Sequence, residues 1–285
     1  MWRAGILAAV ALGCRSGSEP APSKQRDAAV TPVDAAPIVD APRADTSDMI
    51  EIPAGPYTRG CDKPEPMWCS GKFSAEPVGR FYIDRTEVTV EEYARCVAAG
   101  KCPEPTLGGR NCTESTANWA AGRARHPMNC LTAANALIYC MSLHKRLPAT
   151  DEWEKAARGL DGRTYPWGEQ RPTCRRARIK GCGEGTVEVG IHQSGDSPFG
   201  LSDTVGNVWE FVLSMTWAEY TMAYVDYDVA LFADREGVLI RGGGYRSGGV
   251  FGYHLWNEEL GGRATAPPRP DVGFRCAVSF RWRER

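Results

Sequence analysis

Cysteines are the residues of this chain with the greatest chemical potential, because a thiolate is both a nucleophile and a ligand for soft metals. The sequence contains eleven of them. None lies between Cys182 and Cys276, although this stretch holds two distinctive segments, Gly-Asn-Val-Trp-Glu at 206–210 and Arg-Gly-Gly-Gly-Tyr-Arg-Ser at 241–247. The part of the chain that looks most like a functional site therefore contains no thiol of its own.

Apart from Cys14, ten cysteines remain, and an even number in an exported chain indicates disulfides. Local spacing suggests three close pairs, which are Cys61 with Cys69, Cys96 with Cys102, and Cys174 with Cys182. The alternative is a zinc site, which needs ligand pairs separated by roughly two to four residues. Only wider spacings occur here, so we favour disulfides over zinc.

Residues 1–13 have the features of a targeting segment, with an apolar run too short to span a membrane as a helix. The run leads to Val-Ala-Leu-Gly-Cys at 10–14, which resembles the lipobox of bacterial lipoproteins and predicts lipidation of Cys14. Acylation would attach the protein to a lipid bilayer, and we expect an extracytoplasmic location on a bacterial membrane, in the outer membrane or at the cell surface. The alternative is an ordinary signal peptide, which would leave Cys14 as an odd thiol.

Residues 14–48 are rich in Ala, Pro and Asp and lack aromatic residues, which predicts a disordered tether after the lipidated cysteine. Residues 49–280 are long enough to form one domain. The net charge of −1 argues against a nucleic-acid binder, which would carry a basic stripe.

Two strands are predicted at 49–55 and 81–84 from their β-branched and aromatic residues. A helix should begin after Thr89, whose hydroxyl and Glu92 form a capping box, and end at Gly100. Two more helices should follow Thr132 and Thr150, the last ending at Gly159. The apolar face of the middle one should contain Ala133, Ala136, Leu137, Cys140 and Met141. Beyond Gly159 the helical period disappears, so we expect an α+β fold with many loops and short strands.

Five separated motifs then resemble one family. They are the segments Arg146–Gly159, Tyr165–Gly168, Gly206–Glu210, Arg241–Gly243 and Gly273–Cys276, in this order. They resemble the formylglycine-generating enzyme family, also called the sulfatase-modifying factor family. The resemblance implies a variant of the C-type lectin fold with low secondary-structure content and a groove on one face. It also implies a disulfide between Cys140 and Cys276, which leaves Cys112 and Cys130 as the last pair.

Enzymes of this family use two cysteines after the Arg-Gly-Gly turn to bind copper(I), and the resemblance places these positions at Ser247 and Gly252. A serine hydroxyl is a poor ligand for copper(I) and glycine has no side chain. The resemblance therefore implies a domain without copper oxidase activity that serves as a binding or scaffold module. The alternative is an active oxidoreductase that converts a cysteine of exported sulfatase-type proteins to formylglycine through an altered site.

The resemblance also implies a calcium site. Asp203, Gly206, Val208 and Glu210 match positions that supply side-chain oxygens and backbone carbonyls, which suit calcium. The alternative is a buried turn in which Trp209 is in the core and Glu210 is only hydrogen-bonded. A second calcium site of the family is not expected, because Arg178 stands at an asparagine position and its charge should repel the metal.

The groove is expected to be lined by aromatic and polar side chains that would recognise a protein, peptide or glycan ligand. These residues are Tyr245, Arg246, Phe251, Tyr253, His254 and Trp256. For His254, packing against the groove is the alternative. The three glycines at 242–244 predict a tight turn, because no helix follows them to orient amides on a phosphate.

Overall fold

The computed structural model describes residues 44–60, 73–74, 77–106, 108, 111–214, 237–248, 258–259 and 267–279. They all belong to the larger of two units into which the chain divides, Met1–Ala41 and Pro42–Arg285. No helix in these ranges is long and apolar enough to cross a membrane. The predicted lipidation site, the pair Cys61 and Cys69, and the predicted site residues Phe251, Gly252, Tyr253, His254 and Trp256 lie outside the described residues.

Three small sheets form the β part of the fold. β1 (Met49–Ile52), β4 (Phe81–Asp84) and β9 (Ala277–Ser279) are antiparallel in the order β1-β4-β9, and β2 (Thr58–Arg59) pairs with β3 (Phe73–Ser74). The third sheet has the order β7-β6-β5-β8, with β5 (Trp209–Leu213), β6 (Val238–Arg241), β7 (Glu258–Glu259) and β8 (Val272–Gly273). β5 pairs antiparallel with β6 and parallel with β8. Both predicted strands in the first half of the chain are thus confirmed.

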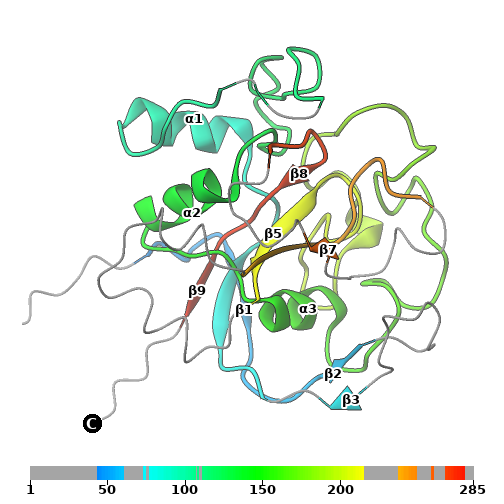
Figure 1. Cartoon of the computed structure of the whole chain (residues 1–285). Coiled ribbons are helices and arrows are strands. Elements are labelled where there is room, and N and C mark those ends of the chain that lie inside the picture. The colour runs from blue at the N-terminus through cyan, green and yellow to red at the C-terminus, as the bar shows by residue number, and fades with distance from the viewer. Residues whose placement is uncertain are drawn as a thin grey trace, which may run out of the picture. The chain divides into compact units, whose positions relative to one another are not determined.

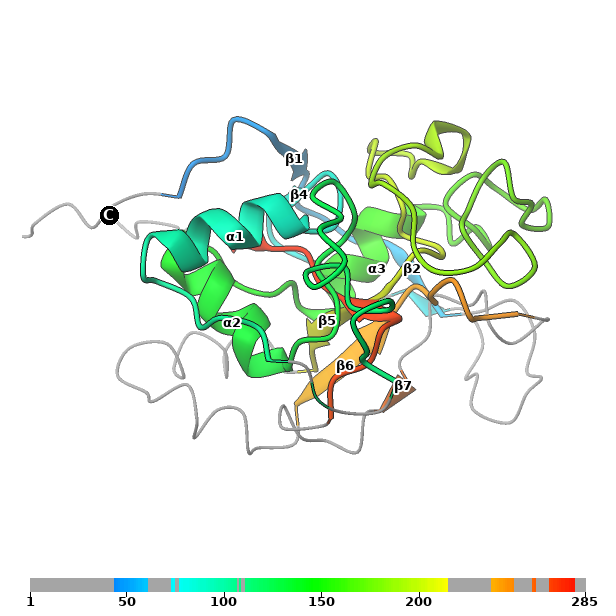
Figure 2. The same ribbon diagram turned by 90° about the horizontal axis from the view of Figure 1, so that it is seen from above.

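The helices are α1 (Val90–Ala98), α2 (Ala133–Ser142) and α3 (Thr150–Arg158), and α1 and α2 lie side by side (Figures 1 and 2). The capping box predicted at Thr89 is confirmed, and the helix predicted after Thr132 begins there with a capping box of its own. The cap predicted for α3 is wrong by one residue. Ala149 precedes the helix and its N–H donates to Glu152, whereas the Thr150 hydroxyl accepts a hydrogen bond from Arg241 Nε at 2.8 Å.

The core has two large parts. One joins α1 and α2 to the β5-containing sheet and includes Tyr93, Leu137 and Phe274, each at most 1% exposed. The other joins α3 to the β1-containing sheet and includes Phe81 and Trp153. The predicted apolar face of α2 is buried except for Met141, which is 37% exposed, so this part of the prediction is wrong. The class is α+β, and from residue 160 onward the described chain contains only short strands and one 3₁₀ turn.

Four disulfides fasten these elements together: Cys96–Cys102, Cys112–Cys130, Cys140–Cys276 and Cys174–Cys182. They are the pairs expected from spacing and from the family resemblance. Cys140–Cys276 spans 136 residues and joins α2 to the residue before β9. Every cysteine in the described part of the chain is therefore oxidised, and no free thiol remains there.

Candidate functional site

Ser247, at the first of the two expected copper positions, belongs to a tight turn. The Ser247 hydroxyl accepts a hydrogen bond from Gly244 N at 3.0 Å, and Ser247 N donates to Gly244 O at 2.8 Å. The turn needs glycine before it, because Gly242 and Gly243 have positive φ angles of 96° and 80°. A Cβ at Gly242 would also lie 2.9 Å from the Thr204 carbonyl oxygen. The hydroxyl at this position thus stabilises a turn over 244–247, which begins at the last of the three glycines rather than within 242–244 as predicted.

Tyr245 and Arg246 are the two predicted groove residues that the structure describes. Tyr245 is only 8% exposed, and the Arg246 guanidinium lies 5.4 Å from the centroid of its ring. Burial raises the pKa of the Tyr245 hydroxyl, while the positive charges of Arg246 and Arg123 act in the opposite direction. Arg246 is exposed. The surface at this point is thus guanidinium rather than the aromatic ring that we predicted.

The loop at 174–185 packs against this turn. Lys180 N donates to Ser247 O at 3.0 Å, and the Lys180 side chain lies against Gly248. Within the loop, the Arg178 guanidinium donates to the carbonyl oxygens of Cys182, Glu184 and Gly185. Three carbonyls thus converge on a cation that is part of the chain.

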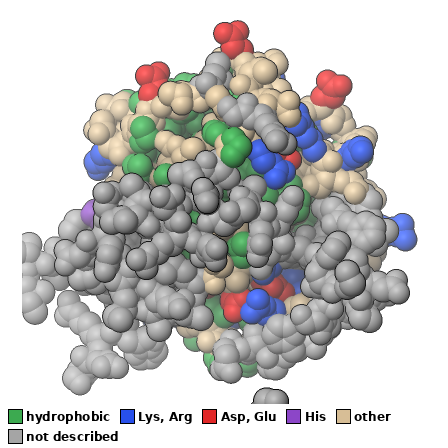
Figure 3. Space-filling view, in the orientation of Figure 1, with side chains coloured by type: hydrophobic (Ala, Val, Ile, Leu, Met, Phe, Trp, Pro, Cys, Tyr) green, Lys and Arg blue, Asp and Glu red, His purple; other side chains and the backbone are tan. Residues whose placement is uncertain are grey.

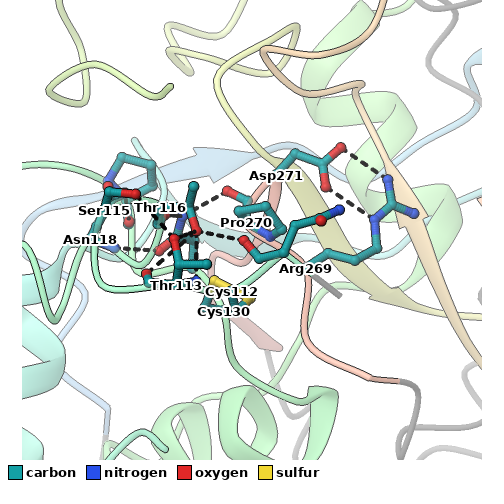
Figure 4. Close-up of a disulfide and its surroundings, with 12 residues drawn as sticks. Cys112, Thr113, Ser115, Thr116, Asn118, Cys130, Arg269, Pro270 and Asp271 are labelled. Carbon is teal, nitrogen blue, oxygen red and sulfur yellow. Dashed lines mark hydrogen bonds and ion pairs between the residues drawn. A yellow bond between two sulfur atoms is a disulfide. The ribbon is translucent and has the colours of Figure 1, made fainter. Parts of the chain in front are cut away.

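A second loop, residues 111–130, is fixed near the same turn by the Cys112–Cys130 disulfide (Figure 4). Asn129 Nδ2 donates to Pro270 O at 2.6 Å, and Cys130 N donates to Arg269 O at 3.1 Å. Arg269 also forms an ion pair with Asp271, whose charge reaches Tyr245. The buried side chain of Asn118 in this loop accepts a hydrogen bond from Arg123 at 3.1 Å. Side chains of the 111–130 loop therefore have fixed positions relative to the turn.

Arg275 and Glu210 form a fully buried ion pair beneath the turn. Arg275 donates to Glu210 through Nε at 2.6 Å and through Nη2 at 2.7 Å, and Trp153 Nε1 donates to Glu210 Oε2 at 2.7 Å. The remaining Arg275 N–H groups donate to the carbonyls of Asp84, Arg85 and Ser202. A guanidinium has five N–H donors, so all of them are used in these bonds.

Two more buried carboxylates lie close to this pair and lack comparable partners. Both carboxylate oxygens of Glu87, which is 0% exposed, have no hydrogen-bond partner, and neither has Asp203 Oδ1. Asp203 Oδ2 accepts one hydrogen bond, from Gly190 N at 2.5 Å. Burial raises the pKa of Asp203, and burial followed by the charge of Asp203 raises the pKa of Glu87 well above its usual range. Three buried carboxylates thus surround one guanidinium.

The predicted calcium residues partly fit a hard cation. Asp203 Oδ1 is buried and accepts no hydrogen bond, so its lone pairs are available to a cation. Glu210 fits less well, because its three accepted hydrogen bonds leave about one of its four lone-pair positions, on Oε1. Among the described residues no group of three or more His, Cys, Asp or Glu side chains is arranged to hold a metal. A cation here would therefore depend on two carboxylates and on backbone carbonyls, as predicted for Gly206 and Val208, and calcium stays a prediction.

Glu87 was missed by the sequence analysis. It lies in the segment between β4 and α1, and it approaches Asp203 only through the fold, 116 residues apart in sequence. Its signal in the sequence is its place in the segment Ile83–Thr89, which also resembles the family and leads to the cap of α1.

A separate cavity of about 700 Å³ lies between α1, the end of α2 and residues 84–88. Its wall includes Asp84, Lys145, Arg95 and Lys101, and neither of the two described groove residues, Tyr245 and Arg246. Acidic and basic side chains both line it, and Lys145 and Asp84 form an ion pair at 2.8 Å. This cavity is therefore distinct from the predicted groove and favours no single class of ligand.

Comparison with known proteins agrees with the geometry. The family described as sulfatase-modifying factor enzyme 1-like domain matches residues 35–280. The formylglycine-generating enzyme of Mus musculus is 25% identical over 281 residues, which covers 81% of this chain and 74% of that protein. The inactive C-alpha-formylglycine-generating enzyme 2 of Bos taurus is 32% identical over 158 residues, covering 50% of this chain and 47% of that protein.

The fold also has solved counterparts. The structure of PvdO from Pseudomonas aeruginosa superposes with a TM-score of 0.57 at 22% identity, covering 81% of this chain and 94% of that one. Such a likeness concerns the fold alone. The family match, in contrast, extends over most of the sequence and includes the motifs around Glu210, Ser247 and Cys276. The chain therefore belongs to the sulfatase-modifying factor enzyme 1-like domain family, which includes the formylglycine-generating enzymes.

Proposed function

We propose that this protein is a family member without copper oxidase activity, and that it acts as an extracytoplasmic binding or scaffold module. The proposal rests mainly on which residue occupies the first expected copper position and on the hydrogen bond that its side chain makes. Ser247 replaces a thiol there, and its hydroxyl is engaged by Gly244 N in the turn. Copper(I) requires soft ligands, which a hydroxyl does not provide.

The other cysteines do not compensate for this loss. Cys276 is bonded to Cys140, and Cys182 to Cys174. A relative whose name describes it as inactive supports the idea that the fold persists in this family without the activity. The rival proposal, an oxidoreductase that forms formylglycine through an altered site, needs a metal ligand set that the described residues do not supply.

The assay is incubation of the purified protein with a cysteine-containing peptide of the sulfatase type, copper(I) and oxygen, followed by mass spectrometry. We expect no aldehyde product above the level without protein. The matched variant is Ser247→Cys with Gly252→Cys, which restores both thiols at the expected positions and should bind copper(I) where the parent protein does not. Aldehyde formation by the unaltered protein would instead establish the oxidoreductase alternative.

We also propose that an acylated Cys14 attaches the protein to a bacterial membrane, with the residues up to 48 as a tether. The support is the lipobox-like segment and the composition that follows it. Replacement of Cys14 by serine removes the atom that would be acylated. This variant should move from the membrane fraction to the soluble fraction when cells are fractionated, whereas Ser16→Ala should not. Equal membrane association of both variants would contradict the anchor.

The buried carboxylates suggest a structural role for calcium in this module. The residues that would hold the ion are Asp203, Glu210 and the carbonyl groups of Gly206 and Val208, with Glu87 close enough to contribute charge. Bound calcium would supply two positive charges to a cluster in which Arg275 has no donor left. Its role would be to stabilise the fold.

A further inference from the structure

We infer that the surface around the 244–247 turn binds an acidic segment of a partner polypeptide through Arg123, Lys180 and Arg246. This inference rests on the proposed binding function and names the class of partner. The three cations come from three separate segments, the 111–130 loop, the 174–185 loop and the turn itself. None of them forms an ion pair with a carboxylate in the described part of the chain.

The position of each cation follows from the contacts of its segment. Arg246 lies over the ring of the buried Tyr245, and the charge of Arg123 also reaches the Tyr245 hydroxyl. Lys180 lies on the other side of the turn, with its stem against Gly248 and its backbone N–H on Ser247 O. All three therefore surround the same few residues of the chain.

Two of the three side chains have contacts that hold them before any partner arrives. Asn118 accepts a hydrogen bond from Arg123, and the Tyr245 ring supports Arg246. The backbone that bears Lys180 belongs to a loop closed by a disulfide and by the bonds of Arg178. Side chains held in this way lose little conformational entropy when they bind, which favours affinity. Lys180 and Arg246 are exposed and Arg123 is half-buried.

Acidic groups near this surface do not neutralise it. Asp271 is 6% exposed and paired with Arg269 at 3.0 Å, and Glu188 is paired with Arg125 at 3.1 Å. Two exposed acids remain on the loops that border this surface, Glu114 and Glu184, and the three cations outnumber them. In Figure 3, basic side chains lie on the upper right of the described surface, and isolated acidic side chains stand at its upper edge. The local charge is thus positive although the whole chain has a net charge of −1.

An acidic polypeptide fits this arrangement better than a nucleic acid or a single small anion. Three cations on separate segments can each meet a different carboxylate of one peptide, whereas a small anion would need donors that converge on one point. A nucleic-acid site would need a larger basic area, which the near-neutral chain does not supply. Charge complementarity of this kind mainly sets partner choice and association rate.

The test is fluorescence anisotropy with the full-length protein in detergent and a labelled peptide of alternating Asp and Glu. A peptide of the same length made of Asn and Gln is the control ligand. We expect binding of the acidic peptide only, with affinity that falls as salt rises. The triple variant Arg123→Gln, Lys180→Gln, Arg246→Gln should lower this affinity about tenfold or more, since it removes all three charge contacts.

A second triple variant, Arg95→Gln, Lys101→Gln, Arg171→Gln, also removes three positive charges, from positions outside the turn and outside the 111–130 and 174–185 loops. It should change the affinity by less than about twofold. An equal loss in both variants would overturn the inference, as would equal binding of the two peptides by the parent protein. Binding of a heparin fragment in place of the acidic peptide would also overturn it. The proposed function is tested separately, because aldehyde formation would refute that proposal whatever the peptide result.

Discussion

Replacement of Arg275 by methionine is expected to lower the free energy of unfolding by about 3–5 kcal/mol, because it leaves a buried carboxylate without its partner. Arg275 and Glu210 are both 0% exposed, and their shortest contact is 2.6 Å. The variant also removes the donors to the carbonyls of Asp84, Arg85 and Ser202. These carbonyls belong to β4, to the residue after it and to the segment before β5. The loss should therefore affect several elements at once.

Urea denaturation followed by circular dichroism measures this change. The matched control is Arg95→Met, which breaks an exposed ion pair between Arg95 and Glu91 at 3.2 Å and should cost less than about 1 kcal/mol. If Arg275→Met does not fold, Arg275→Lys retains the charge with fewer donors and should still be less stable than the parent. A loss below 1 kcal/mol for Arg275→Met would show that the buried pair contributes little.

The local features of the fold follow from the sequence because their causes are local. The capping boxes at Thr89 and Thr132 require only residues three positions apart; the first forms as predicted, and the second forms where only the start of a helix was predicted. Thr150 is different, since its hydroxyl serves Arg241, 91 residues away, and no local pattern reveals this bond. Met141 follows the helical period of the buried face, but neighbouring elements leave it partly uncovered.

The candidate site also combines features that the sequence predicts with features that depend on the three-dimensional fold. Motif order was enough to predict the Cys140–Cys276 pair, because this pair depends on family position, and the assignment of Ser247 to a copper position stays a prediction. The role of the Ser247 hydroxyl in its turn was not predicted, and neither was the guanidinium cover on Tyr245. Glu87, Asp203, Glu210 and Arg275 come from four separate segments. These charged side chains come together only in the folded protein. The sequence therefore indicated Asp203 and Glu210 but not Glu87.

Because these buried carboxylates lie close together, we expect the stability of the folded protein to depend on calcium. Glu87 accepts no hydrogen bond, Asp203 accepts one, and every N–H of Arg275 is already used, so these two carboxylates are costly in a buried site unless a cation or protons neutralise them. If calcium binds there, the folded protein gains stability by mass action, about 2.7 kcal/mol when calcium is at 100 times its dissociation constant. A chelator should therefore lower the melting temperature of the parent protein by several degrees.

Two variants separate a bound ion from a general effect of charge. Asp203 has a left-handed backbone with φ 59°, which asparagine also tolerates, so Asp203→Asn retains the fold and an oxygen ligand but loses the charge. Glu87→Gln removes the neighbouring charge without altering the size of the side chain. Both should reduce the difference in melting temperature between calcium and chelator, and Glu87→Gln should not lower stability in chelator, where it only removes repulsion. Asp161→Asn, in an exposed pair with Arg163, should leave the difference unchanged. Equal melting temperatures of the parent protein in calcium and in chelator would contradict the site, and Glu87 and Asp203, whose pKa values burial raises, would then have to be neutralised by protons.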